Sequence, residues 1–220
     1  MSKLARLKPE TTCLMICDVQ EKVYTINPLS RPCVYVLSID ASPRYCAAQF
    51  RAAIYRFATV VTGAQRMVRA ANELSMPVIV TEQYPKGLGH TVEELDLSKA
   101  AAVVAKTDFS MIVPEVTAKL NECKTTDAVI VGLESHVCVQ QTTLDLIASG
   151  YNVHICVDAI SSQSPTDRAC GLHRAAGAGA FLTTTESVMM ELIRSKDHPS
   201  FKAISNTLKE TRPAEPLEFM

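Results

Sequence analysis

Two stretches decide the fold, Leu14-Met-Ile-Cys-Asp18-Val-Gln20 near the start and Val129-Ile-Val-Gly-Leu-Glu-Ser-His-Val-Cys-Val139 in the second half. Each is an apolar run that stops at a polar residue able to do chemistry, which is typical of a buried parallel strand followed by a turn. In open α/β sheets, ligands bind just beyond the carboxyl ends of such strands. We therefore expect Asp18 and Cys138 to meet at one edge of one sheet, although they lie far apart in the chain.

The rest of the chain shows the same kind of pattern. Short apolar runs predict strands, and segments with a 3.6-residue hydrophobic period predict helices between most of these strands. The expected strands are Thr12–Cys17, Val78–Thr81, Ala102–Lys106, Ala128–Gly132, Val153–Asp158 and Ala180–Thr183. The expected helices are Phe50–Leu74, Val139–Ser149, Thr166–Ala176 and Thr185–Arg194. Alternation of this kind favours right-handed βαβ crossovers. The sequence thus predicts an α/β fold, a three-layer α/β/α arrangement with a mostly parallel, Rossmann-like six-stranded sheet.

Length and composition set further expectations. The chain has 220 residues, of which 47% are hydrophobic and 20% charged, with a formal net charge of -1. This suits a single α/β domain over residues 1–220. No basic stripe and no run of about 18 apolar residues occurs, so neither a nucleic-acid partner nor a membrane span is expected. The basic start without an apolar signal core favours a cytoplasmic protein; a fragment of a mitochondrial targeting segment is the alternative.

Eight cysteines (positions 13, 17, 33, 46, 123, 138, 156 and 170) occur without a CxxC pair or zinc-ligand spacing. This argues against a metal site and against a disulfide framework, and favours a reduced intracellular protein. Cys17 and Cys156 lie within apolar runs, where a thiol behaves as a small hydrophobe. No Gly-rich phosphate loop follows any strand, so no organic cofactor is expected.

Four ordered motifs carry a resemblance: Cys17-Asp-Val-Gln-Glu-Lys22, Thr81-Glu-Gln-Tyr-Pro-Lys-Gly-Leu-Gly89, Lys106-Thr-Asp-Phe-Ser-Met111 and Gly132-Leu-Glu-Ser-His-Val-Cys-Val139. Together they resemble the isochorismatase-like hydrolase family of the cysteine hydrolase superfamily, within it the eukaryotic isochorismatase domain-containing members of the protein 2 type. The resemblance covers nearly everything except Val23–Gln49 and the last few residues, and it implies a small-molecule substrate and a homo-oligomer.

By this resemblance, Asp18, Lys106 and Cys138 occupy an Asp-Lys-Cys triad. An ordinary thiol has a pKa near 8.5 and is mostly protonated at neutral pH, whereas the thiolate is the nucleophile. Lys106 would favour the thiolate by charge, and Asp18 could accept the thiol proton and later donate it. The resemblance therefore implies a cysteine hydrolase acting on an amide- or ester-like carbonyl. Two alternatives stay open: a non-catalytic binding or regulatory protein that keeps the fold, and a thiol-based redox sensor.

Six further residues are expected to bind substrate: Gln20, Gln83, Tyr84, Leu133, Glu134 and His136. His136 has two interpretations, a proton carrier or a hydrogen-bonded turn histidine. Amide N–H groups of the turn 133–138 could form an oxyanion hole. The family's cis peptide would fall at Leu133–Glu134. The metal-binding members hold two closely spaced histidines on one loop, and since this chain has no His-x-x-His, no metal is expected.

The range Val23–Gln49 interrupts the first motif as an atypical insert, and residues 211–220 form an expected C-terminal tail with Pro213 and Pro216. In the family the motif reads on directly into Phe-Arg, as Phe50-Arg51 would here if the insert were removed. Codons for valine begin with GT and glutamine can be encoded by CAG, which are the ends of an intron. Two interpretations follow: a retained intron translated in frame, or a genuine long loop.

Overall fold

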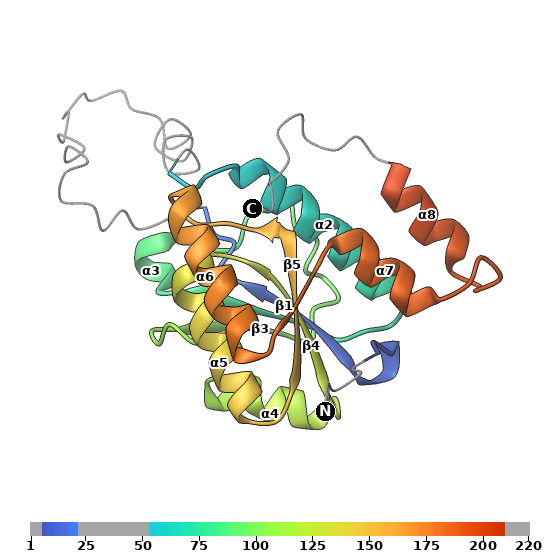
Figure 1. Ribbon diagram of the computed structural model, residues 1–220, viewed down its shortest axis with the longest axis horizontal. Helices are drawn as coiled ribbons and strands as arrows, with labels where there is room; N and C mark the ends of the chain where they lie inside the picture. Colours follow the sequence, from blue (N-terminus) through green and yellow to red (C-terminus); the bar gives the residue numbers. More distant parts are fainter. Residues whose placement is uncertain (1–5, 22–52, 210–220) are drawn as a thin grey trace.

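The computed structural model of the chain describes residues 6–21 and 53–209 (Figure 1). The strands are β1 (Thr12–Cys17), β2 (Val78–Gln83), β3 (Ala102–Lys106), β4 (Asp127–Gly132), β5 (Asn152–Ile160) and β6 (Phe181–Thr183). The helices are α2 (Phe57–Glu73), α3 (Pro85–Leu88), α4 (Pro114–Glu122), α5 (Gln140–Ala148), α6 (Pro165–Ala178), α7 (Thr185–Ile193) and α8 (Phe201–Lys209). Two short helical turns, η1 (Pro9–Thr11) and η2 (Ser135–Val139), complete the described part.

The six strands form one sheet in the order β3-β2-β1-β4-β5-β6, and every pair of neighbours is parallel. The predicted Rossmann-like sheet is confirmed. After β1 the chain builds outward through β2 to β3, then crosses back to place β4 on the other side of β1. Reversal of strand order between β1 and β4 leaves a crevice at their carboxyl ends, where open α/β sheets bind ligands.

Helices cover both faces of the sheet, which makes three layers (Figure 1). One face packs on α2 and α7 through a buried apolar cluster that includes Val60, Met67 and Val188, and α8 packs against these two helices. The other face packs on α4, α5 and α6 through a second cluster that includes Leu120 and Leu146. Since β1 and β4 are buried along their whole length, their continuous apolar sequences have a direct physical cause.

The structure departs from the sequence expectations at several elements. The first long helix begins at Phe57 rather than Phe50, and α4 and α8 were not predicted. The insert Val23–Gln49 and the tail 211–220 lie outside the described residues. Between β2 and β3 the described chain forms only the four-residue helix α3, so this crossover is not the long helix typical of βαβ units.

Across the described ranges, no helix combines the length and apolar character that crossing a membrane requires.

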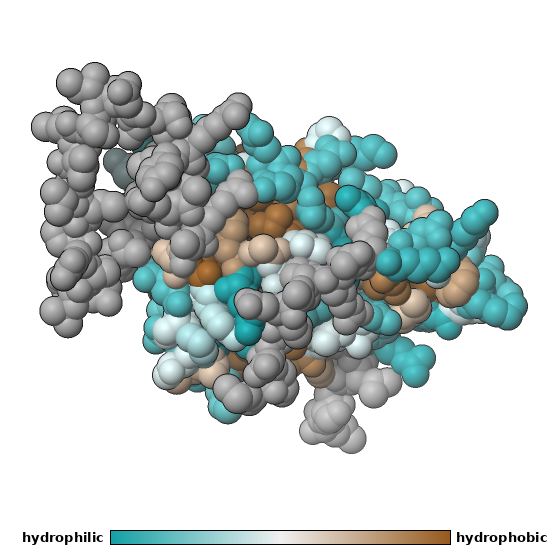
Figure 2. Space-filling view, turned by 90° about the horizontal axis from the view of Figure 1, so that it is seen from above, coloured by the Kyte–Doolittle hydropathy of each residue, from teal (hydrophilic) through white to brown (hydrophobic). Residues whose placement is uncertain are grey.

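The edge strand β3 is only partly covered. Its residues alternate in exposure, and Val103 is 48% exposed. Two aromatic side chains of nearby loops, Tyr84 and Phe109, are exposed to a similar degree. Figure 2, which views the molecule from above, shows hydrophobic surface gathered near the middle between hydrophilic regions. Apolar groups therefore remain at the surface after the three layers have packed.

A buried histidine near the start of β5 gives the fold an acid-sensitive point. His154 is 4% exposed and stacks on Phe181, with the two ring centroids 5.0 Å apart. Its Nε2 atom lies 3.8 Å from Asp127 Oδ1 and has no hydrogen-bond partner in the described part of the chain. Burial lowers the pKa of His154 below its ordinary value, although the nearby Asp127 carboxylate opposes this.

We expect this histidine to lower the stability of the protein in acid. The unfolded chain binds a proton on His154 below about pH 6.5, whereas the folded chain binds it only at lower pH, so stability falls as the pH drops through this window. The urea concentration at the unfolding midpoint should therefore decrease between a pH above about 6.5 and a pH below it, and the decrease should be larger for the wild type than for His154→Gln. An equal fall in both proteins would show that His154 does not contribute.

Candidate active site

Asp18 directly follows β1 and takes a left-handed backbone conformation with a φ of 50°. This region is uncommon for residues other than glycine, although aspartate is enriched in it. The amide of Asp18 donates to the carbonyl of Thr81 in the neighbouring strand β2 at 3.2 Å, and the Thr81 hydroxyl donates to Asp18 Oδ1 at 2.7 Å. The end of β2 thus fixes both the backbone and the carboxylate of Asp18.

Lys106 is the last residue of β3, and its side chain is completely buried. The ammonium nitrogen Nζ donates to Asp18 Oδ2 at 2.8 Å and to Gln83 Oε1 at 2.6 Å. It also lies 3.1 Å from each of the carbonyl oxygens of Asp108 and Phe109. An ammonium carries three N–H donors, so these acceptors use all of its hydrogens.

The surroundings of Lys106 favour its charged form. Burial by itself would lower the pKa of this lysine. The acidic groups of Cys17, Asp18 and Cys138 outweigh that effect and raise the pKa of Lys106 above its ordinary value. Lys106 is therefore a fixed positive charge without a free N–H, suited to an electrostatic role and not to proton transfer.

Cys138 lies in the turn that follows β4. The strand ends at Gly132, and the peptide bond between Leu133 and Glu134 is cis, at the position that the sequence analysis expected. The π-helical turn η2 comes next, and the Val139 amide closes it by donating to the Glu134 carbonyl at 3.1 Å. Cys138 is buried within this turn, with 7% of its surface exposed.

Helix α6 supports this turn from behind. The Ser135 hydroxyl donates to the carbonyl of Arg168 in α6 at 2.9 Å, and the Ser135 amide donates to the Ser161 carbonyl at the same distance. Gly171, one turn further along α6, faces the same segment so closely that an added Cβ would lie 2.5 Å from the Ser135 carbonyl group. A glycine at this position lets the helix approach the backbone that carries Cys138.

The structure thus brings the three residues of the expected triad to one edge of the sheet. Asp18 and Lys106 form a buried ion pair, and Cys138 is near enough to Lys106 to affect its pKa. Within the described ranges, however, no hydrogen bond joins Cys138 directly to Asp18. The Cys17 thiol donates to Asp18 Oδ2 at 3.7 Å, and it lies in the same buried cluster as Cys138, which contributes to the raised pKa of Cys17.

Two of the expected substrate-binding residues, Gln20 and Gln83, use their amide groups within the protein. Gln20 donates to the carbonyls of Gln83 (3.0 Å) and Gly89 (2.6 Å) and accepts from the Gln83 amide at 2.7 Å. The Gln83 side chain accepts from Lys106 and donates to the Thr107 carbonyl at 2.7 Å. These glutamines hold the loop after β2 and orient Lys106, and their contact with substrate stays a prediction.

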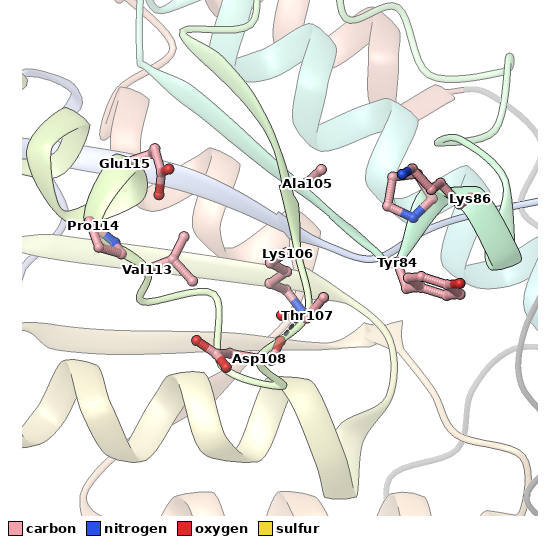
Figure 3. Close-up of a pocket in the computed structure, with 10 residues that line it drawn as sticks. Tyr84, Lys86, Ala105, Lys106, Thr107, Asp108, Val113, Pro114 and Glu115 are labelled. Atoms are coloured by element: carbon pink, nitrogen blue, oxygen red, sulfur yellow. Dashed lines mark hydrogen bonds between the residues drawn. The ribbon is translucent and has the colours of Figure 1, made fainter.

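Tyr84, a third expected substrate-binding residue, lines a cavity of about 440 Å³ beside the edge strand β3. Figure 3 shows Tyr84 and Lys86 on one side of this cavity and Val113, Pro114 and Glu115 on the other, with Lys106 and Asp108 between them. Neither Asp18 nor Cys138 is among its lining residues. The cavity is therefore adjacent to the ion pair and does not open onto the thiol.

The remaining expected residues belong to the turn after β4. Leu133 is buried, whereas His136 is partly exposed and its Nδ1 atom lies 3.0 Å from the Ser162 hydroxyl. This contact matches the interpretation of His136 as a hydrogen-bonded turn histidine. Glu134 accepts from the Gln163 amide at 3.0 Å, and burial raises the pKa of its carboxyl group. Substrate contacts of all three residues stay predictions.

Sequence reasoning missed two polar groups of the site, Thr81 and the Cys17 thiol. Cys17 is fully buried, as expected for a small hydrophobe, but its thiol also faces the carboxylate of Asp18. Cys17 and Thr81 are register partners in the parallel pair of β1 and β2. The available signal was that both apolar runs end at these positions, which places them side by side in parallel strands.

No group of three or more His, Cys, Asp or Glu side chains in the described part of the chain is arranged to hold a metal ion. The described cysteines are all free thiols, namely Cys13, Cys17, Cys123, Cys138, Cys156 and Cys170. The expected triad thus presents a carboxylate, an ammonium and a thiol at this edge, and Cys17 adds a second thiol.

Comparison with known proteins places this geometry in context. Residues 12–187 match the isochorismatase domain. Isochorismatase domain-containing protein 1 from Danio rerio is 41% identical over 99% of this chain and 68% of its own length. Isochorismatase domain-containing protein 2 from Xenopus laevis is 37% identical over 97% of this chain and 91% of its own length.

Solved structures agree with this match. A structure described as the MAR1 ribonuclease from Caenorhabditis elegans is 38% identical, covers 98% of this chain and 100% of its own, and gives a TM-score of 0.79. The YcaC gene product from Escherichia coli, described as an octameric hydrolase of unknown specificity, is 18% identical. It covers 94% of this chain and 98% of its own with a TM-score of 0.68, and at this identity it shows the fold alone.

Proposed function

The chain belongs to the isochorismatase family, and from this premise we propose that it is a cysteine hydrolase of small carbonyl substrates, with an amide- or ester-like scissile bond. Cys138 is the nucleophile, Asp18 carries the proton and Lys106 is the electrostatic partner. The observation that carries the proposal is the buried ion pair of Lys106 and Asp18, 2.8 Å apart, with the Cys138 thiol beside it.

Charge balance explains why such a pair suits a thiol nucleophile. With a neutral thiol, the site holds one negative carboxylate and one positive ammonium. When the proton moves from Cys138 to Asp18, the negative charge moves to sulfur and the net charge of the site does not change. Because Lys106 is fixed by its acceptors, its charge is in place before the proton moves, which is the preorganisation that favours charge development in a buried site.

The reaction then follows two chemical stages. The thiolate of Cys138 attacks the substrate carbonyl carbon, and Asp18 returns the proton to the departing amine or alcohol, which leaves a thioester on Cys138. Asp18 next takes a proton from water, whose oxygen attacks the thioester; the C–S bond breaks, the acid is released, and the Cys138 thiolate takes the proton back from Asp18. The amides of Leu133, Ser135 and Val137 already donate to protein carbonyls. The other backbone amides of the turn 133–138 are therefore the proposed donors to the oxyanion of both tetrahedral intermediates, where each donor contributes about 3–4 kcal/mol.

The proposal predicts that Cys138 is alkylated by iodoacetamide much faster than an ordinary thiol at mildly acidic pH, because the ion pair provides both a proton acceptor and a positive charge. Labelling is read by mass spectrometry as a function of pH. Cys123 is the internal control: partial burial and the neighbouring Glu122 carboxylate raise the pKa of its thiol, so its labelling should rise only in alkaline solution.

Two outcomes of that measurement are decisive. Fast labelling of Cys138 near pH 6 supports an activated nucleophile and justifies a screen of small amides and esters, with Cys138→Ala as the inactive control. Labelling of Cys138 that rises only together with that of Cys123 would contradict the proposal and would favour the non-catalytic binding role.

One comparison supports a second candidate activity. The Caenorhabditis elegans protein described as a ribonuclease is 38% identical over nearly the full length of both chains. The net charge of this chain is only -1, and its buried site pairs the lysine with an internal carboxylate, so we favour the carbonyl substrate. Single-stranded RNA belongs in the same screen, and cleavage that requires Cys138 would replace the carbonyl assignment.

We also propose that copies of the chain associate. The partly uncovered strand β3, with exposed Val103 and the neighbouring aromatic residues Tyr84 and Phe109, offers an apolar surface that association would bury. The Escherichia coli relative of this fold is described as octameric. A cytoplasmic location, with a mitochondrial one as the alternative, stays a prediction.

A further inference from the structure

Two thiols meet at the active-site edge of the sheet. Cys17 is fully buried at the end of β1 and Cys138 is nearly buried in the turn after β4, and both belong to the same apolar cluster. The two thiols are neighbours within this cluster, and Cys138 is near enough to Cys17 to contribute to its raised pKa. Catalysis as proposed above needs only one of them, so the second thiol has no role in the hydrolytic mechanism.

The backbone holds this arrangement in place. Strands β1 and β4 are in register, with Cys17 opposite Gly132, and the Leu133 amide donates to the Cys17 carbonyl at 2.7 Å. Gly132 has a φ of 119°, and an added Cβ would lie 2.1 Å from that carbonyl oxygen. The turn η2 then brings the backbone after Cys138 back to Glu134, since the Val139 amide donates to the Glu134 carbonyl at 3.1 Å, and Cys138 joins the buried cluster that contains Cys17.

We propose that Cys17 is the resolving cysteine of Cys138: after a hydroperoxide oxidises Cys138, Cys17 forms a reversible disulfide with it. The inference goes beyond hydrolysis and rests only on the reactivity proposed above for Cys138. A disulfide at this position blocks the nucleophile while it persists and protects it from irreversible oxidation, and a thiol reductant restores it.

The chemistry balances in two steps. The Cys138 thiolate attacks one oxygen of the hydroperoxide and the O–O bond breaks. The alkoxide or hydroxide released takes the proton that Asp18 had accepted from Cys138, which leaves a sulfenic acid on Cys138 and an ionised Asp18. The Cys17 thiol then passes its proton to Asp18, whose Oδ2 atom is 3.7 Å away. The Cys17 sulfur attacks the Cys138 sulfur, the S–O bond breaks, and the hydroxide leaves as water with the proton from Asp18.

The environments of the two thiols assign these roles. Burial is the largest cause that raises the pKa of Cys17 well above its ordinary value, so Cys17 is a poor first target for a peroxide. Cys138 retains some exposure, 7% against none for Cys17, and lies beside the positive charge of Lys106. The peroxide therefore reaches Cys138 first. Cys17 lies in the same buried cluster, at the end of the strand next to the turn that carries Cys138, so a local movement of the turn can bring the two sulfur atoms to the S–S bond length of about 2.05 Å.

The test is a mass-spectrometric map of the linkage after treatment with hydrogen peroxide. The chain carries Cys13→Ala and Cys156→Ala, so that the tryptic peptides 7–22 and 125–168 each contain one cysteine. We expect a cross-linked pair of these peptides that is lost on reduction. Adding Cys17→Ala should abolish the cross-link and convert Cys138 to sulfinic acid, which a thiol reductant does not reverse. As a control, the same cross-linked peptides are isolated from the protein without the two alanine substitutions. Their fragmentation spectra should locate the disulfide between Cys17 and Cys138 there too.

Several results would overturn the inference: sulfinic acid on Cys138 at equal rates with and without Cys17, a cross-link between other cysteines, or no oxidation of Cys138. Iodoacetamide labelling separates this failure from failure of the proposed function. Fast labelling of Cys138 without a cross-link removes the resolving role and leaves the hydrolase proposal standing, whereas slow labelling with no oxidation contradicts both.

Discussion

Replacing Lys106 with methionine is expected to destabilise the protein by about 3–5 kcal/mol, the usual cost of removing one partner from a buried ion pair. The methionine leaves the Asp18 carboxylate buried at the end of β1 with the hydroxyl of Thr81 and the weak thiol donor of Cys17. It also leaves the Gln83 side-chain oxygen and the carbonyls of Asp108 and Phe109 without the ammonium. The free energy of unfolding in urea measures the loss.

The same substitution should slow the alkylation of Cys138, because no positive charge then favours the thiolate. Lys119→Met is the matched control: Lys119 contacts Glu122 at 2.7 Å on the exposed surface of α4, where an ion pair contributes little. Asp18→Asn combined with Lys106→Met should recover part of the stability and none of the reactivity. A Lys106→Met protein as stable and as reactive as Lys119→Met would disprove the role of the pair.

Substituting Gly171 with alanine is the second change with a large expected effect. The added Cβ would lie 2.5 Å from the Ser135 carbonyl carbon and oxygen and 2.6 Å from the His136 amide nitrogen. All of these are backbone atoms, so either α6 or the turn that carries Cys138 must move. We expect a loss of about 1–3 kcal/mol in stability, as for other overpacked sites, and slower alkylation of Cys138.

Gly177 provides a control within the same helix. It is exposed, and an added Cβ would meet nothing within 4 Å. Because alanine has the higher helix propensity, Gly177→Ala should raise the free energy of unfolding by about 0.5–1 kcal/mol and leave Cys138 labelling unchanged. If Gly171→Ala behaves like Gly177→Ala in both measurements, α6 does not position the nucleophile.

Much of the fold was predictable because strands that are buried on both faces of the sheet have continuous apolar sequences. The predicted limits of Thr12–Cys17 and Ala102–Lys106 agree with β1 and β3. β2 was predicted two residues short because Glu82 and Gln83 are polar; the strand continues since Thr91 and Gln20 satisfy their polar groups. Helix α4 was missed because only two of its residues, Val116 and Leu120, are buried, which is a weak periodic signal.

The candidate site was predictable only where a residue with a reactive or charged side chain directly follows an apolar run of the sequence. Asp18, Lys106 and Cys138 all do so, with the family resemblance assigning their roles. Contacts across strands leave no such trace: Thr81 reaches Asp18 through the register of β1 and β2, and α6 reaches the turn through Gly171. The ends of the two apolar runs indicate that Thr81 lies beside Cys17, but they do not show its hydrogen bond to Asp18, and nothing in the sequence indicates the contact of Gly171.

The position of Lys106 on an edge strand has a consequence for how the site is lost. Among the residues that the structure describes, β3 pairs with β2 alone and has no strand on its other side. Edge strands exchange their amide hydrogens through local opening that requires less free energy than global unfolding. A brief detachment of five residues removes the cation from the carboxylate and the thiol while the rest of the sheet stays folded. Anything that clamps this border, whether a bound molecule or an associated copy, therefore raises the fraction of chains in which Lys106 stays paired with Asp18 beside Cys138.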